Sequence, residues 1–307
     1  MSIKIFTDAC SNLFKDILKE KKIDIVVLPM SLQIQDKTYL CYEDDIDVEK
    51  ISIELFDYLE SGKKVKTSLT CPGVFYERVI SEVDKGNEVI FISVASGISG
   101  NFQSALLMAK QINNEKGKEV VKVIDSKTAS FGEAMAAIYA YEKATANEPF
   151  EKVVKDVEDY VKTVRSEFTV DNIKYLAATG RVSSLTATIA NILSIKPILY
   201  GSDNAKIEVF TKVHGRGNAI KTLANQVGEY IKDKKSKVYI AHCNAKEDAI
   251  RLQNLLKEKG IDNSKIYIYD LVTGAHVGKG TLAVFYEGEN RTLEKNNIVK
   301  TIINKIK

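Results

Sequence analysis

The chain has 307 residues, 45% of them hydrophobic, which is long enough for two domains with sizeable cores. Its 44 basic and 41 acidic residues give a formal net charge of +3, and this near balance argues against a dedicated nucleic-acid-binding protein. No apolar run approaches the ~18 residues of a transmembrane helix, and the first residues lack the long apolar region of a signal peptide. The four cysteines are scattered, so we expect a cytoplasmic protein with free thiols.

Strands and helices alternate through the first half of the chain. Short apolar runs predict strands over residues 3–7, 24–28, 33–39, 88–94 and 120–124, the third of them irregular. Apolar residues at i, i+3, i+4 spacing predict helices over residues 13–21, 48–61, 72–85, 102–112 and 129–146. This alternation is typical of a mainly parallel sheet covered by helices on both faces.

The rhythm changes near residues 147–149, where a charged helix over residues 150–165 leads into the second half. That half is predicted to hold strands over residues 197–200, 207–213, 238–242, 265–271 and 281–286. Helices are predicted over residues 184–193, 218–232 and 245–259. The sequence therefore predicts an α/β protein with two α/β domains, residues 1–160 and 161–307, the boundary falling between about 147 and 168.

The last segment, residues 290–307, alternates apolar side chains with lysines and is predicted to form a basic amphipathic helix. Such a helix can lie on a membrane surface. This one is short, so we expect it to dock on its own domain, with transient membrane contact as the alternative.

Small hydroxyl-bearing clusters follow the predicted strands of the first half, where ligands of open α/β sheets bind. The most informative is the loop over residues 95–101, with two serines and two glycines directly before a helix. Free N–H groups and the positive dipole end of a helix suit a carboxylate or phosphate. The alternative is ordinary N-capping by Ser99 or Asn101. Thr67 and Ser68 supply a second pair of donors before another helix, or simply form a turn.

The second half adds three candidate side chains. His276 stands among glycines after a predicted strand, near the edge of the sheet, where an imidazole can bind an anion or have no role. Arg181 and Arg216 each stand beside a glycine, and a guanidinium suits carboxylate or phosphate, although most arginines are simply solvated. The uncharged stretch between residues 182 and 195 could line an apolar pocket or fill the core.

Several catalytic motifs are missing from the sequence. Residues 274–281 approach a phosphate-binding loop, but the glycine spacing is one residue short and Gly280 separates Lys279 from Thr281. No Gly-x-Ser-x-Gly motif, recognisable catalytic Cys–His motif or pair of histidines at i, i+4 is present, so we expect no metal and no cofactor. A phosphoryl- or acyl-transfer enzyme that uses the same glycine and serine loops is the alternative to a binding protein.

Taken in order, several blocks resemble the DegV family, the fatty-acid-binding proteins that serve a bacterial fatty acid kinase. The blocks are TDACSNL (7–13), VLPM (27–30), TSLTCPGVF (67–75), SGISGNFQSA (96–105), VIDS (123–126), GRVS (180–183), IKPIL (195–199) and HVGKG (276–280). Together they span about residues 3 to 286, and the block at 96–105 is the most specific.

The resemblance implies two α/β domains with an acyl chain buried in a tunnel between them, and a protein that is not itself an enzyme. The implied ligands of the fatty acid carboxylate are Thr67, Ser68, Ser96 or Ser99, Gly100 and His276. The implied tunnel residues are Ile189, Leu193 and Ile195, and Arg181 and Arg216 become candidates for docking the kinase or neutralising charge. The partner kinase would phosphorylate the carboxylate while this protein holds it.

Overall fold

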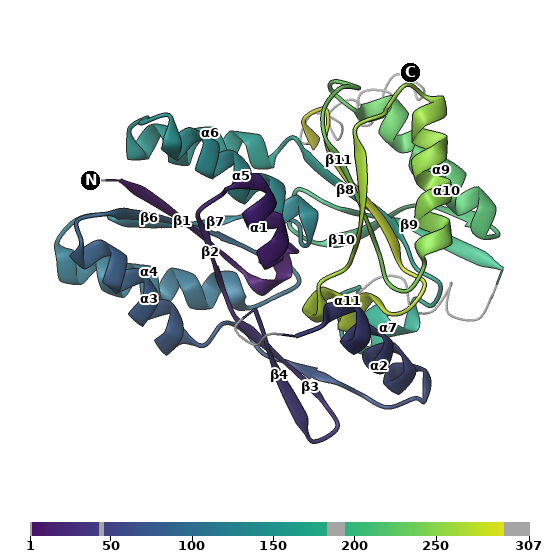
Figure 1. Ribbon diagram of the computed structural model, residues 1–307, viewed down its shortest axis with the longest axis horizontal. Coiled ribbons are helices and arrows are strands. Elements are labelled where there is room, and N and C mark those ends of the chain that lie inside the picture. The colour runs from purple at the N-terminus through teal and green to yellow at the C-terminus, as the bar shows by residue number, and fades with distance from the viewer. Residues whose placement is uncertain (1, 43–45, 183–193, 292–307) are drawn as a thin grey trace, which may run out of the picture.

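The computed structural model describes residues 2–42, 46–182 and 194–291, which form three sheets with helices packed against them (Figure 1). The helix predicted over residues 184–193, with Ile189 and Leu193, and nearly all of the tail predicted over 290–307 lie outside the described residues. Within the described ranges, no helix is long and apolar enough to cross a membrane.

The first sheet is fully parallel and has the strand order β2-β1-β6-β7. Its strands are β1 (Ile3–Asp8), β2 (Ile25–Leu28), β6 (Glu88–Ser93) and β7 (Val121–Asp125). On one face, Phe6 and Phe91 pack against α3 (Pro72–Asp84) and α4 (Asn101–Lys116). On the other face, Ile5 and Ile90 pack against α5 (Phe131–Thr145). The predicted helix-covered parallel sheet is thereby confirmed.

The second sheet has six strands in the order β10-β9-β8-β13-β11-β12, and only β11 and β12 pair in parallel. Its strands are β8 (Val164–Thr169), β9 (Ile195–Gly201), β10 (Ile207–His214), β11 (Val238–His242), β12 (Ser264–Ile268) and β13 (Leu282–Glu287). The helices α9 (Arg216–Tyr230) and α10 (Lys246–Glu258) cover its outer face (Figure 1).

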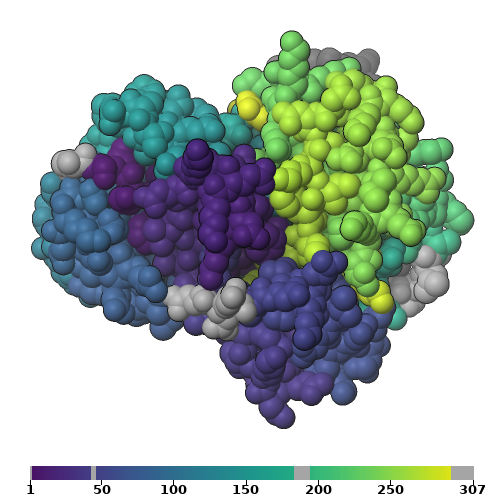
Figure 2. Space-filling model, in the orientation of Figure 1, coloured from purple at the N-terminus to yellow at the C-terminus, as the bar shows by residue number. Residues whose placement is uncertain are grey.

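The alanine-rich helix α5 packs against strands of both large sheets. Its small side chains Ala134, Ala136, Ala137 and Ala140 are fully buried, because a helix covered on two sides has little room for larger ones. One core cluster consequently runs from the first sheet to the second. In Figure 2 the purple and blue first half meets the green and yellow second half along one seam. The helix α6 (Phe150–Val161) packs on α5.

A small antiparallel sheet, ordered β4-β3-β5, extends from the first half. It consists of β3 (Met30–Ile34), β4 (Lys37–Cys41) and the short β5 (Lys66–Thr67), and α2 (Val48–Glu60) packs against α11 (Leu271–Val277) beside it. The prediction of a single strand over residues 33–39 is wrong, because the chain turns at Gln35, which has a left-handed φ of 54°.

Two elements of the second half differ from prediction. The helix predicted over residues 150–165 ends at Val161, and β8 follows as a central strand with all six residues buried. Two charged residues of this strand, Arg165 and Glu167, are buried as an ion pair with Nε and Oε1 3.0 Å apart. The glycine-rich segment around His276 is helix α11 rather than a loop, and Asp270 caps its N-terminus through Thr273 N.

Three short elements complete the described chain. They are η1 (Ala9–Ser11), α1 (Lys15–Lys21) and α7 (Lys174–Ala178). The first parallel sheet lies within residues 3–125 and the second sheet within residues 164–287. The domain boundary near residue 160 stays a prediction.

Candidate functional site

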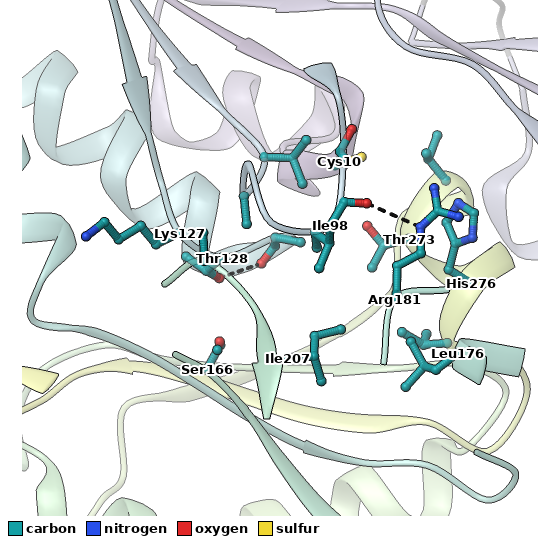
Figure 3. Close-up of a pocket in the computed structure, with 18 of the residues that line it drawn as sticks. Cys10, Ile98, Lys127, Thr128, Ser166, Leu176, Arg181, Ile207, Thr273 and His276 are labelled. Carbon is teal, nitrogen blue, oxygen red and sulfur yellow. Dashed lines mark hydrogen bonds between the residues drawn. The ribbon is translucent and has the colours of Figure 1, made fainter. Parts of the chain in front are cut away.

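A cavity of about 280 Å³ is lined by residues of all three sheets, including Met30 of β3, Val94 directly after β6, and Phe168 of β8 (Figure 3). The carboxyl ends of β1, β6 and β7 deliver Cys10, Ala95 and Thr128 to one wall, which is the edge where open α/β sheets bind ligands. Its volume is just below the ~300–1,000 Å³ typical of small-molecule pockets.

Most of the cavity wall is apolar. The rings of Phe168 and Phe285 contribute from the second sheet, together with Ile207 of β10 and Leu176 of α7. The Tyr269 ring packs edge-on against Phe285 with 6.3 Å between centroids. Such a wall suits a hydrocarbon chain.

A larger cleft of about 550 Å³ lies between α1, β12 and the chain near Tyr42. It is lined by several charged side chains, among them Lys15, Lys19 and Glu20. None of the site residues predicted from the sequence lines it, so we place the candidate site in the smaller, more apolar cavity.

Polar groups gather at one end of the smaller cavity. Thr67 Oγ1 and His276 Nε2 are 3.0 Å apart, which joins β5 of the first half to α11 of the second. His276 Nδ1 is buried and has no hydrogen-bond partner among the described residues, and neither does the buried Thr273 Oγ1 one turn earlier. These atoms leave unmet hydrogen-bonding capacity in the cavity wall.

The imidazole of His276 is neutral at neutral pH. Burial, and to a smaller extent the positive charge of Arg181, lowers its pKa from 6.5 to about 4. Figure 3 shows the Arg181 guanidinium beside the His276 ring. Arg181 itself is anchored to two backbone carbonyls, through Nε to Ile98 O at 3.2 Å and through Nη1 to Thr179 O. Burial lowers the pKa of its guanidinium, but arginine stays charged in proteins.

The two serines that the sequence could not tell apart, Ser96 and Ser99, differ in their position relative to the cavity. Ser96 is exposed, and its hydroxyl donates to Asp125 Oδ2 at 2.6 Å, outside the cavity lining. Ser99 lines the cavity, and its Oγ accepts from Asn101 N at 3.2 Å, which leaves the hydroxyl proton free to donate. Ser99 is therefore the better candidate for contact with an anion.

Ser68 also lines the cavity, but its hydroxyl is committed. Its Oγ donates to Leu69 O at 2.9 Å and accepts from the backbone N and the hydroxyl of Ser31. Ser68 thus holds β5 against β3 and contributes less donor capacity than its neighbour Thr67.

Three other predicted residues lie off the cavity lining. Gly100 has φ −75°, and a Cβ there would only meet Leu69 Cδ1 at 3.7 Å, so neither conformation nor space demands a glycine. Ile195 begins β9, and its strand partner is His214. Arg216 is paired with Asp248 and Asp171, with N–O distances of 2.7 and 3.5 Å.

The match to a known family decides the identity. The family described as uncharacterised protein, DegV family, matches residues 2–289. This chain belongs to the DegV family. The curated DegV domain-containing protein CPE0026 of Clostridium perfringens is 29% identical over 289 residues, which cover 94% of this chain and 98% of the relative.

Two solved DegV structures are similar throughout. The fatty acid binding DegV family protein SAG1342 from Streptococcus agalactiae is 26% identical with a TM-score of 0.82, and the match covers 94% of this chain and 100% of that one. A DegV family protein from Ruminococcus gnavus, described with vaccenic acid, is 26% identical with a TM-score of 0.80, covering 93% and 99%.

Sequence reasoning missed several residues that line the cavity of this DegV protein. Cys10 and Thr128 belong to the clusters that follow the first and last predicted strands of the first half, but no sequence feature singled them out from those clusters as site residues. Phe168 and Ser166 lie on β8, a strand that the sequence did not predict. Among the described residues, no group of three or more His, Cys, Asp or Glu side chains is placed to hold a metal ion.

Proposed function

We propose that this DegV protein binds one long-chain fatty acid in the cavity and presents its carboxylate to a fatty acid kinase. The observation that carries the proposal is the cluster of donors around Thr67, Ser99 and His276 at one end of a mainly apolar cavity. Two related structures, one of a fatty acid binding DegV family protein and one described with vaccenic acid, support the ligand class.

The apolar wall supplies the binding energy. Each methylene of an acyl chain that leaves water contributes roughly 0.8 kcal/mol. Phe168, Ile207 and Phe285 give the chain an apolar path away from the polar end. A long chain therefore binds more tightly than a short one.

The carboxylate is held by donors rather than by a direct ion pair. A neutral His276 can donate from Nε2 to Thr67 Oγ1, which leaves the Thr67 proton to donate to a carboxylate oxygen. The Ser99 proton is free for the same carboxylate. The nearby charge of Arg181 stabilises the anion, and hydrogen bonds to a charged group are stronger than neutral ones.

The polar end can be reached from outside. Ser68 and Leu69 line it and are exposed, Leu69 by 41%. A carboxylate held there is accessible to a partner that carries the nucleotide, and we place this exchange in the cytoplasm. Arg181 would neutralise the developing acyl phosphate, and Arg216 remains a candidate for the kinase-docking surface.

The experiment is a reconstitution with a purified fatty acid kinase, ATP and a C18 fatty acid, with acyl phosphate trapped by hydroxylamine. The expected product forms only when kinase, this protein and free acid are all present, and the methyl ester of the same acid gives none. Product formed by this protein and ATP without kinase would instead establish the phosphoryl-transfer enzyme. Tight binding without product in the full mixture would remove the kinase partner from the proposal.

A further inference from the structure

The end of the cavity away from His276 contains a second polar group, the hydroxyl of Ser166 (Figure 3). Ser166 and Phe168 alternate on β8, so both side chains face the cavity while Glu167 faces the opposite side of the sheet. The Ser166 residue is only 8% exposed, and no hydrogen bond to its Oγ is formed by any residue in the described part of the chain.

Gly201 of β9 keeps this hydroxyl open to the cavity. A Cβ at residue 201 would lie 2.7 Å from Ser166 Oγ and 3.4 Å from the backbone oxygen of Lys127. The backbone oxygen of Gly201 accepts from Arg291 Nη1 at 2.8 Å, and the same nitrogen would lie 3.7 Å from that Cβ. A donor hydroxyl, that of Ser166, and an acceptor carbonyl, that of Lys127, therefore lie on either side of the space next to Gly201, which we call the corner of the cavity.

The carbonyl of Lys127 completes the corner. It accepts no hydrogen bond from the described residues, and the charged end of the Lys127 side chain points away from the cavity in Figure 3. The hydroxyl of Thr128 on the same wall is different, since it donates to Ala129 O at 3.1 Å. Ser166 Oγ and Lys127 O are thus an uncommitted donor and acceptor deep in an apolar wall.

We propose that this corner binds a hydroxyl group on the acyl chain, so that the ligand class includes long-chain hydroxy fatty acids. A ligand hydroxyl can accept from Ser166 and donate to Lys127 O, which satisfies both groups at once. A plain methylene placed there leaves two buried polar groups without partners, which is unfavourable. The inference rests on the proposed fatty acid binding, because it concerns the same cavity.

The test is direct binding of C18 acids, one unsubstituted and others carrying one hydroxyl at successive positions of the distal half. Wild-type protein is expected to bind one positional isomer about 3- to 10-fold more tightly than the unsubstituted acid, the factor of one neutral hydrogen bond. Ser166→Ala should abolish this preference and bind the unsubstituted acid at least as tightly as the wild type does. Ser202→Ala is the matched control, because Ser202 has a buried hydroxyl next to Gly201 but does not line the cavity.

The outcomes separate the two ideas. If the wild type prefers no isomer, the proposed hydroxyl site is wrong, and a water molecule bound between Ser166 Oγ and Lys127 O would give this result. A preference that persists in Ser166→Ala also contradicts the site. A second variant, Gly201→Ala, is expected to lose the preference because its Cβ occupies the corner. Failure of every acid, substituted or not, to bind would contradict the proposed function instead.

Discussion

At the scale of single residues, the two serines of the loop before α4 make the sharpest comparison. Ser99→Ala removes a free donor from the polar end, so fatty acid binding should weaken by about 1.5–3 kcal/mol, roughly 10- to 100-fold. Ser96→Ala should leave the affinity unchanged, since its hydroxyl is committed to Asp125 outside the cavity. Isothermal titration with one long-chain acid measures both, and equal losses would remove Ser99 from the site.

His276 gives the pH dependence of the same site. Burial lowers its pKa to about 4 from 6.5, so between these values the unfolded chain binds more protons than the folded protein does. The stability that the neutral ring contributes is present above pH 6.5 and is lost as the pH falls toward 4. Relative to His276→Gln, the wild type should lose about 2 kcal/mol between pH 7 and pH 5.

Urea unfolding of both proteins at the two pH values measures this difference. Subtracting the free energy of unfolding of the variant from that of the wild type removes the contributions of the other titrating groups. A wild-type protein that tracks the glutamine variant across this range would mean that the His276 ring is solvated in the folded state.

At the scale of elements, α11 matters because it carries both Thr273 and His276. Its N-cap Asp270 accepts from Thr273 N at 2.6 Å through Oδ1, while the buried Oδ2 has no partner in the described chain. Burial, and to a smaller extent the negative charge of Asp8, raises the pKa of Asp270 to about 8. The folded protein therefore holds this proton, and the stability it contributes is lost as the pH rises through 8.

Asp270→Asn keeps a capping oxygen and removes the titration. The variant should gain stability relative to the wild type between pH 5 and pH 8, by an amount on the order of 3 kcal/mol. Chemical denaturation at both pH values measures the gap. A constant gap would show that Asp270 is ionised in the folded protein across this range.

The elements also show how far the sequence could predict the fold. The alternation of the first half predicted the parallel sheet, because apolar strands and amphipathic helices there follow their local patterns. Strand β8 was missed since Arg165 and Glu167 satisfy each other in the core, a pairing that no local pattern reveals. Helix α11 was missed because Gly274 weakens its helical pattern, while its buried contacts with α2 and β3 stabilise it.

For the candidate site, the resemblance to a family supplied Thr67, Ser99 and His276, and the cavity lining includes all three. The sequence could not choose between Ser96 and Ser99, because the choice depends on Asp125, which is the last residue of a different strand, β7. Ser166 could not be predicted because it lies on β8, and that strand was itself missed. In each case the missing information was a contact between residues that are far apart in the sequence or a strand that the local pattern did not show.

At the scale of the whole molecule, Asn12 joins the two halves. It is fully buried with a left-handed φ of 59°, and its Nδ2 donates to Ile268 O at 2.9 Å. Its Oδ1 accepts from Asp270 N at 2.6 Å and from the Ser130 hydroxyl at 3.1 Å. One side chain of the first half thus satisfies two backbone groups of the second.

Asn12→Ala leaves those buried groups without partners and places an alanine in a left-handed conformation. It should lower the free energy of unfolding by about 3 kcal/mol. Asn147→Ala is the matched control, because Asn147 is exposed with φ 56° and should cost only the conformational part, about 1 kcal/mol. Equal effects in thermal unfolding would mean that the contacts of Asn12 between the halves contribute nothing.

The central claim is that the cavity between the halves holds a fatty acid. The most direct measurement is organic extraction of the purified, unfolded protein, followed by mass spectrometry of the extract against a known standard. We expect a long-chain fatty acid at about one per chain, either as purified or after incubation with a mixture of common acids. An empty extract under both conditions would contradict it.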